Sequence, residues 1–276
     1  MSNQYLVVGS PIDHSKSPAI HSAAYSVLGL DWQYGRLDVA KGGLRQVLDN
    51  APEALYGFSV TMPLKEEAAR NAVFRDEFVQ RSGAANTLMR DESGWRAYNT
   101  DVYGIVKAVR PALEAAAPVI LIIGSGATAF SAMMAAGLLG AREVLVFARN
   151  RVTRKQLVDF GRESGLKVRA VRRFASAISK ADFTISTLPA RALDTLAARL
   201  KERAPQAIRG GLLDVAYEPW PSLAAQVWAS AGKPVVSGLD MLIWQAIAQL
   251  RIFTTGNPNQ ELPNEVAVVE AMRHAV

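Results

Sequence analysis

The 276-residue sequence contains no cysteine. Disulfide bonds, thiolate nucleophiles and zinc sites with thiolate ligands are therefore excluded. A reducing cytoplasm is the default compartment for such a chain, so we expect a cytoplasmic protein, and we expect no metal site.

Long apolar runs and runs of like charge are also missing. No hydrophobic stretch reaches the roughly 20 residues of a membrane helix, and the N-terminal MSNQYLVVGSP lacks the pattern of a secretory signal. The net charge is +6, but the basic residues are scattered. An anionic cofactor and an anionic substrate explain this excess, so we expect neither a nucleic-acid nor a membrane partner.

A glycine-rich segment runs from Val119 to Phe130 and reads VILIIGSGATAF. Its aliphatic run is typical of a strand buried on both faces of a parallel sheet, and a G-x-G-x-x-A pattern follows. In this pattern the first glycine permits a tight turn, the second lets backbone N–H groups approach a pyrophosphate, and the small third residue packs helix on strand. A plain strand-to-helix turn is the alternative. The fitting flanks favour a dinucleotide site.

Short apolar runs alternate with amphipathic stretches on both sides of this segment. The first part predicts an αβ unit that closes with a hairpin over 86–98 and a helix over 100–114. After Pro118 the strands predicted at 119–123, 143–148, 167–171, 182–186 and 211–215 alternate with helices, as in a doubly wound parallel sheet. We therefore expect an α/β protein with a substrate domain over 1–103, completed by helices from 240–276, and a Rossmann-like domain over 104–239.

Two hydroxyls lie close together in GSPIDHSKSPAIH, the segment from Gly9 to His21. Ser17 before Pro18 is a good helix start, with serine as the N-cap and proline at the first helical position. This alternative explains Ser17 but not Ser15. Paired hydroxyls at a helix N-terminus suit a carboxylate, because they donate hydrogen bonds and the helix dipole favours an anion.

A lysine and an aspartate follow in two further segments. In GFSVTMPLKEEA, Lys65 stands in the first turn of a helix, where the dipole disfavours a cation, although Glu66 and Glu67 offer the alternative of a solvated helix start. In NTDVYG, Asp101 or Thr100 can simply cap a helix. If Lys65 and Asp101 instead meet in a cleft, they form a proton-transfer pair suited to interconverting a hydroxyl and a ketone.

The segments HSKSP, SVTMPLKEEA, AANTLMR, NTDVYG, GSGATA and GLDMLIWQA, in this order and spacing, resemble the shikimate dehydrogenase family. The resemblance covers nearly the whole chain. It implies two αβ domains with the active site in the cleft between them. It also implies reversible NADPH-dependent reduction of 3-dehydroshikimate to shikimate, a step in chorismate and aromatic amino-acid biosynthesis.

The resemblance also implies roles for individual residues. The implied catalytic pair is Lys65 and Asp101. The implied substrate-binding residues are, for the carboxylate, Ser15, Ser17 and Tyr217, and, for the ring hydroxyls, Thr61, Asn86, Asp101 and Gln245, with Lys65 beside them. The implied cofactor-binding residues are Gly124, Ser125, Gly126, Ala127, Thr128, Ala129, Thr187, Gly238 and Met241.

The strand after the glycine loop indicates which nicotinamide cofactor is preferred. NAD-binding folds usually carry an acidic residue about 20 positions after the loop, whereas an arginine accommodates the 2′-phosphate of NADP. Here EVLVFARN ends in Ala148 and Arg149, and Arg151 and Arg154 follow at the start of a helix, where only a bound anion offsets their charge. A solvated basic turn is the alternative. We expect NADP, bound by Arg149, Arg154 and a hydrogen bond from Asn150.

Three departures from the family pattern bear on selectivity. Ser59 replaces a common asparagine, Val102 replaces a glycine, and ISTLPARA over 185–192 replaces NATSxG around Thr187. A quinate/shikimate dehydrogenase therefore stays open as an alternative. A non-catalytic sensor of NADP or shikimate is opposed by the intact Lys65 and Asp101, and a nucleic-acid-binding regulator by the lack of an added module. We expect a monomer or a homodimer.

Overall fold

The structure, a computed structural model, describes residues 2–203 and 205–276. The chain forms two compact units: the first runs up to Asp101 and resumes over Ile243–Val276, and the second spans Val102–Leu242. Each unit has its own sheet and apolar core. The division falls at the start of helix α5 (Asp101–Val109) and inside helix α11 (Gly238–Thr255).

Six strands form the sheet of the first unit: β1 (Gln4–Gly9), β2 (Gln33–Asp38), β3 (Leu55–Val60), β4 (Phe74–Arg75), β5 (Thr87–Asp91) and β6 (Gly94–Tyr98). Their order is β2-β1-β3-β5-β6-β4. Strand β1 pairs in parallel with β2 and β3, whereas β5 pairs antiparallel with β3 and β6. The predicted hairpin is confirmed as β5 and β6.

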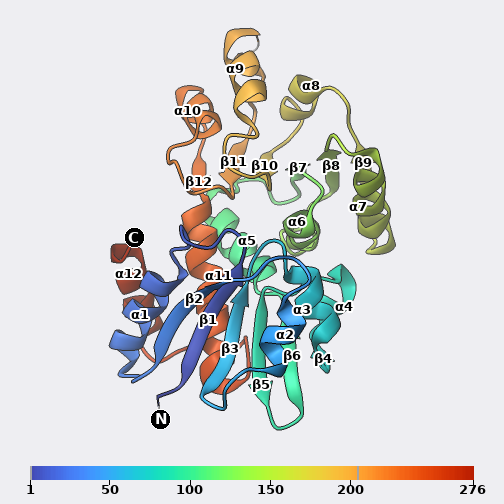
Figure 1. Ribbon diagram of the computed structural model, residues 1–276. Helices are drawn as coiled ribbons and strands as arrows, with labels where there is room; N and C mark the ends of the chain where they lie inside the picture. Colours follow the sequence, from blue (N-terminus) through green and yellow to red (C-terminus); the bar gives the residue numbers. More distant parts are fainter. Residues whose placement is uncertain (1, 204) are drawn as a thin grey trace. The chain divides into compact units, whose positions relative to one another are not determined.

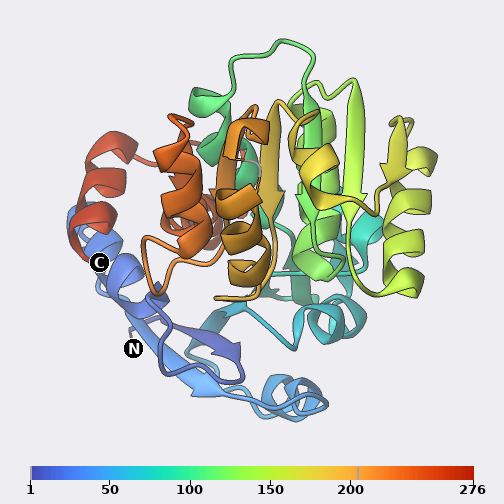
Figure 2. The same cartoon turned by 90° about the horizontal axis from the view of Figure 1, so that it is seen from above.

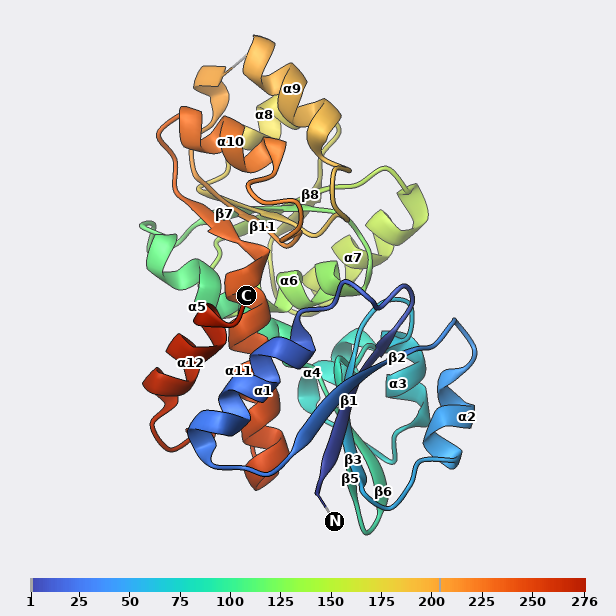
Figure 3. The ribbon, with the colours of Figure 1, turned by 60° about the vertical axis from the view of Figure 1, so that its left-hand side comes forward.

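Helices cover both faces of this first sheet (Figures 1 and 3). One face carries α1 (Ser17–Leu28), α12 (Glu265–His274) and the end of α11, and the other carries α2 (Leu44–Asp49), α3 (Lys65–Asn71) and α4 (Glu77–Ser82). Successive strand residues point to opposite faces, which explains the two sets of contacts. Phe58 belongs to the core that includes Leu44 and Val79, whereas the ring of Tyr5 lies 4.5 Å from that of Phe253.

The second unit contains a parallel sheet of six strands: β7 (Val119–Ile123), β8 (Glu143–Phe147), β9 (Val168–Ala170), β10 (Phe183–Ser186), β11 (Gly211–Asp214) and β12 (Val235–Ser237). Their order is β12-β11-β10-β7-β8-β9. From the central strand β7 the chain adds β8 and β9 on one side and then β10, β11 and β12 on the other. Every residue of β7 is buried, as its apolar run predicted.

Helices lie on both sides of this row of strands (Figure 2). They are α6 (Ala127–Leu138), α7 (Arg151–Glu163), α8 (Phe174–Ile178), α9 (Asp194–Arg203) and α10 (Leu223–Ser230). The doubly wound fold class is therefore confirmed. Among the helices of the described residues, none is both long and apolar enough to cross a membrane.

The helix predicted over 100–114 is shorter than expected. It ends as α5 at Val109 and continues only as a 3₁₀ turn over Arg110–Ala112. Pro111 lacks an N–H group and cannot extend the α-helical hydrogen bonds, so the prediction was wrong in its last turn.

A buried histidine joins α1 to β2 in the first unit. His21 is fully buried, its Nδ1 lies 3.0 Å from the carbonyl oxygen of Ser17, and its ring stacks on Tyr34 at 4.1 Å. Burial lowers the pKa of His21 from 6.5 to about 4, against a smaller increase from the hydrogen bond with Ser17. The side chain is therefore neutral in the folded protein at neutral pH.

This histidine should make the folded protein less stable in mild acid. Below pH 6.5 the unfolded chain takes up a proton that the folded chain does not bind until about pH 4, so the free energy of unfolding falls as the pH decreases through this window. Between pH 7.5 and pH 5 we expect the free energy of unfolding of the unmodified protein to fall by about 2 kcal/mol more than that of His21→Gln. The glutamine keeps a hydrogen-bond donor for the Ser17 carbonyl. Urea unfolding of both proteins measures the difference, and equal losses would contradict it.

Candidate active site

The loop after β1 presents the two serines that the sequence indicated. Ser17 is buried and is the first residue of α1, whereas Ser15 is half-buried before it. The backbone N–H of Ser17 donates to Ser15 Oγ over 3.3 Å. The alternative in which Ser17 is the N-cap is wrong, because Lys16 already has α-helical dihedral angles and occupies that position. The side chain of Lys16 makes no capping hydrogen bond, so apart from the bond from the Ser17 N–H to Ser15 Oγ the first turn of α1 has no side-chain cap.

Gly9, at the end of β1, lets this loop approach the loop after β3. A Cβ at this position would collide with Thr61 Cγ2 and with the carbonyl oxygen of Met62. The N–H of Ser10 donates to that carbonyl over 3.0 Å. Because β1 and β3 are neighbouring parallel strands, their carboxyl ends share one edge of the sheet, where open α/β folds bind ligands. Thr61 and the two serines therefore follow strands that end at this edge.

Lys65, at the start of α3, pairs with Asp101, at the start of α5. Lys65 Nζ donates to Asp101 Oδ2 over 2.5 Å. The N–H of Ala85 donates to the Lys65 carbonyl over 2.9 Å, which ties the start of α3 to the segment before β5. The exposed fraction is 16% for the Lys65 side chain and 6% for that of Asp101, so the pair is largely withdrawn from water while the lysine stays accessible.

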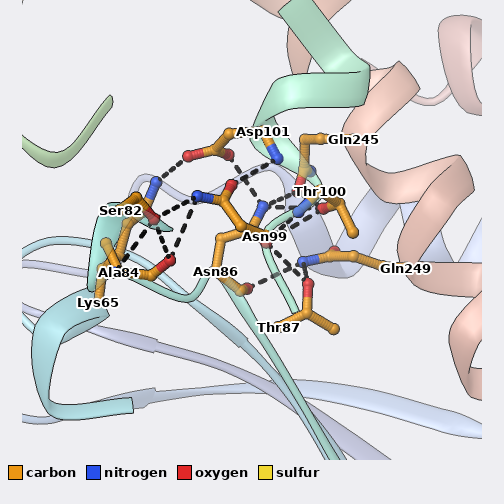
Figure 4. A network of polar contacts seen from close by, with 10 residues as sticks. All are labelled: Lys65, Ser82, Ala84, Asn86, Thr87, Asn99, Thr100, Asp101, Gln245 and Gln249. Atoms are coloured by element: carbon orange, nitrogen blue, oxygen red, sulfur yellow. Dashed lines mark hydrogen bonds and ion pairs between the residues drawn. The ribbon is translucent and has the colours of Figure 1, made fainter. Parts of the chain in front are cut away.

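The amide of Asn86 connects this pair to α11 (Figure 4). Asn86 Nδ2 lies 2.9 Å from Asp101 Oδ1, 2.8 Å from Thr100 Oγ1 and 3.1 Å from Gln245 Oε1. Asn86 Oδ1 accepts from the N–H of Thr100 over 2.8 Å and from the hydroxyl of Thr87 over 2.9 Å. Asn86 is buried, so each of these bonds matters to its orientation. The amide thereby fixes the Asp101 carboxylate on the side opposite Lys65.

This cluster combines an amine that can donate a proton with side chains that can form hydrogen bonds to hydroxyls. A lysine amine can exchange a proton with an oxygen that is oxidised or reduced. The carboxylate and the two amides offer acceptors and donors to neighbouring hydroxyls. The arrangement suits a small polyhydroxylated molecule. Within residues 2–203 and 205–276, no three His, Asp or Glu side chains form a group that could hold a metal ion.

Sequence reasoning missed Thr87 and Gln249 and noted Ser59 only as a departure. Ser59 Oγ donates to Gln249 Oε1 over 2.7 Å. Gln249 lies one turn beyond Gln245 on α11, and both amides are buried. Two glutamines four residues apart on a largely apolar helix share a face, and this pattern could have identified Gln249 from the sequence.

The glycine loop of the second unit has the predicted strand–loop–helix form. Gly124 has a φ of 116°, in the left-handed region that favours glycine. A Cβ there would collide with Thr187 Oγ1, which donates to the last carbonyl of β7 over 3.0 Å, so Thr187 lies against the loop. Gly126 is the N-cap of α6, and no side chain caps that helix. The hydroxyls of Ser125 and Thr153 are 2.7 Å apart and tie the loop to α7.

Basic residues surround the turn between β8 and α7. Asn150 caps α7, since its Oδ1 accepts from two N–H groups of the first turn over 2.9 and 3.2 Å. Arg154 Nη1 donates to the carbonyl of Ala148 over 3.0 Å, and Arg149 is exposed. The first turn of α7 contains no acidic residue. The turn therefore presents positive charge at the carboxyl edge of the sheet, beside the N-terminus of α7.

Tyr217 lies in the loop after β11, and a partly buried hydrogen bond closes this loop. Ser222 Oγ donates to Asp214 Oδ2 over 2.8 Å. Burial raises the pKa of Asp214, and the bond from Ser222 opposes this increase. A Cβ at Gly238 would collide with the backbone of the same loop, so the start of α11 packs against it, with Met241 buried one turn further on.

Known proteins resemble the chain over almost its whole length. Residues 7–88 match the family model described as the shikimate dehydrogenase substrate binding domain. A shikimate dehydrogenase (NADP(+)) of Thermosynechococcus vestitus is 30% identical over 266 residues, which cover 91% of this chain and 90% of that protein.

Solved structures share both the fold and its extent. Mycobacterium tuberculosis shikimate dehydrogenase has a TM-score of 0.86 and 39% identity, covering 99% of this chain and 100% of its own. The Thermus thermophilus enzyme, solved with NADP(H) and shikimate, has a TM-score of 0.82 and 26% identity, covering 99% and 100%. Together with the order of the sequence motifs, these similarities show that the chain belongs to the shikimate dehydrogenase family.

Proposed function

We propose that this protein is an NADP-dependent shikimate dehydrogenase, an oxidoreductase that reversibly reduces 3-dehydroshikimate to shikimate. The observation that carries the proposal is the Lys65–Asp101 pair, which Asn86 holds at the carboxyl edge of the first sheet in a chain of this family. The reaction belongs to chorismate and aromatic amino-acid biosynthesis.

The substrate has one anionic group and three ring oxygens to be recognised. We assign its carboxylate to the hydroxyls of Ser15, Ser17 and Tyr217, and the uncapped start of α1 favours the same charge. The ring hydroxyls are assigned to the side chains of Thr61, Asn86, Asp101 and Gln245. Fixing the ring in this way supports the rate, because reaction depends strongly on orientation.

When bound, the nicotinamide supplies a hydride to substrate carbon C3 or accepts it from there. Lys65 Nζ donates a proton to the C3 oxygen during reduction and takes it back during oxidation. Asp101 orients this amine and accepts a hydrogen bond from the neighbouring hydroxyl. Asn86 holds the carboxylate, so the pair is positioned before the substrate binds.

The second unit has the features that NADP requires. The glycine loop from Gly124 to Ala129 and the uncapped N-terminus of α6 suit the pyrophosphate, and Thr187 lies beside that loop. Arg149 and Arg154 are assigned to the 2′-phosphate, since a guanidinium fork matches its oxygens. Asn150 adds a hydrogen bond from its amide nitrogen, because its oxygen caps α7. The start of α11, with Gly238 and Met241, is assigned to the nicotinamide.

The ligands are a small-molecule substrate and NADP, and the protein acts as a monomer or homodimer in the cytoplasm. A non-catalytic sensor would have no need of the Lys65–Asp101 pair, which favours the enzyme. We propose shikimate rather than quinate as the preferred substrate, and the kcat/KM values of the two substrates test this choice.

Replacing Lys65 with alanine tests the proton-transfer role. We expect kcat for shikimate oxidation with NADP to fall about 100-fold or more, the range of lost general acid–base catalysis, with a smaller change in KM. Lys41→Ala, at an exposed lysine of the same unit, is the control and should keep its kcat. Steady-state NADPH formation measures both. A near-normal kcat with a raised KM would mean that Lys65 only binds substrate.

Cofactor preference tests the role of Arg149. The unmodified protein should have a kcat/KM for NADP roughly 10- to 100-fold above that for NAD, the equivalent of about one charge-assisted hydrogen bond. Ala148→Asp combined with Arg149→Ala should invert this preference, because the new carboxylate accepts the ribose 2′-hydroxyl and repels the phosphate. Arg142→Ala, at the amino end of β8, is the matched control. Equal kcat/KM values for the two cofactors in the unmodified protein would refute the assignment.

A further inference from the structure

Gln249 is a buried amide that the proposed mechanism does not use. It is 1% exposed on α11, and a buried glutamine needs partners for both its oxygen and its nitrogen. Its Oε1 accepts from Ser59 Oγ over 2.7 Å. Its Nε2 donates to Thr87 Oγ1 over 3.0 Å and to the Asn86 carbonyl over 3.1 Å. Both ends of the amide therefore have partners outside α11, and Figure 4 shows the two bonds of the nitrogen end, to Thr87 and Asn86.

From Ser59 the hydrogen bonds continue towards the serine loop. The hydroxyl of Tyr34, on β2, donates to Ser59 Oγ over 2.5 Å. The Tyr34 ring also stacks on His21 of α1, with the ring centroids 4.1 Å apart. Because Gln249 Oε1 has no hydrogen, Ser59 must donate to it, and the lone pairs of Ser59 are left for Tyr34. This fixes the direction of the hydroxyls between α1 and α11.

From Gln249 the bonds continue towards Lys65. Thr87 Oγ1 accepts from Gln249 and donates to Asn86 Oδ1 over 2.9 Å. Asn86 Nδ2 then reaches Asp101 Oδ1, and Asp101 Oδ2 accepts from Lys65. The backbone of Asn86 is held independently, since its carbonyl also accepts from the N–H of Val60 over 2.7 Å. Gln249 therefore fixes the orientation of the Thr87 hydroxyl, and this hydroxyl in turn fixes the orientation of the Asn86 amide.

We propose that Gln249, linked by Ser59 to Tyr34, is a positioning residue that orients Asn86 through Thr87 and so holds the Lys65–Asp101 pair in its reactive geometry. The proposal rests on the proposed function for its kinetic consequence only. Its structural content is the continuous line of side-chain hydrogen bonds from Tyr34 to Lys65, which spans β2, β3, α11, β5, α5 and α3.

Gln249→Met tests this role with a side chain of similar volume and no amide. We expect kcat for shikimate oxidation to fall about tenfold, with KM for NADP unchanged within about twofold, because the lost bonds lie outside the cofactor site. Ile252→Val, another buried change on α11, is the matched control and should alter stability without altering kcat. If the control lowers kcat as much, the effect is one of packing and the proposal fails.

Coupling to Asn86 distinguishes positioning from a separate structural role. In an Asn86→Ala background, Gln249→Met should lower kcat by less than about twofold, since the group through which it acts is already gone. A full tenfold loss in that background would overturn the proposal. If Gln249→Met does not fold, Thr87→Val replaces it in both experiments, because this change removes only the connecting hydroxyl. Thr87→Val should also lower kcat about tenfold alone and by less than about twofold in the Asn86→Ala background.

A readout without turnover separates this proposal from the proposed function. If the unmodified protein does not oxidise shikimate, the proposed function fails. The side-chain amide signal of Asn86 in ¹H–¹⁵N NMR spectra then still tests whether Gln249 orients Asn86. Gln249→Met should shift that signal and speed its hydrogen exchange by about tenfold or more, whereas Ile252→Val should not. An unchanged Asn86 signal would overturn the positioning role.

Discussion

The Lys65–Asp101 pair depends on the buried amide of Asn86. A carboxylate withdrawn from water keeps its charge at low free-energy cost only if hydrogen bonds replace its hydration. Asp101 receives one such bond from Lys65 and one from Asn86. Asn86 is held in turn by Thr100 and by Gln245 of α11. The geometry of the pair is therefore a property of several packed elements rather than of two side chains.

Strand direction brings these elements to one place. Because β5 pairs antiparallel with both β3 and β6, the carboxyl ends of β3 and β6 and the amino end of β5 lie at the same edge. Lys65 follows β3, Asp101 follows β6 and Asn86 precedes β5. The parallel neighbour β1 adds the serine loop at that edge, and Gly9 allows the close approach. In the second unit the glycine loop likewise follows a central parallel strand.

Local patterns predicted the features that depend on neighbouring residues, and they failed where distant packing decides. The apolar run before Gly124 predicted the buried strand β7, and the family motifs selected Lys65, Asn86 and Asp101. The N-cap was misplaced because Lys16 already adopts helical angles. The bonds of Gln249 were missed because Asn86 is 163 residues away, and no local pattern shows which strand faces that amide.

The most direct test of the account is a comparison of initial rates for shikimate and quinate, each with NADP and with NAD, on the unmodified protein. With the substrate and cofactor assignments proposed above, shikimate with NADP should give the highest kcat/KM of the four combinations. Turnover of quinate with NAD at an equal or higher kcat/KM, or no turnover of shikimate, would contradict the account.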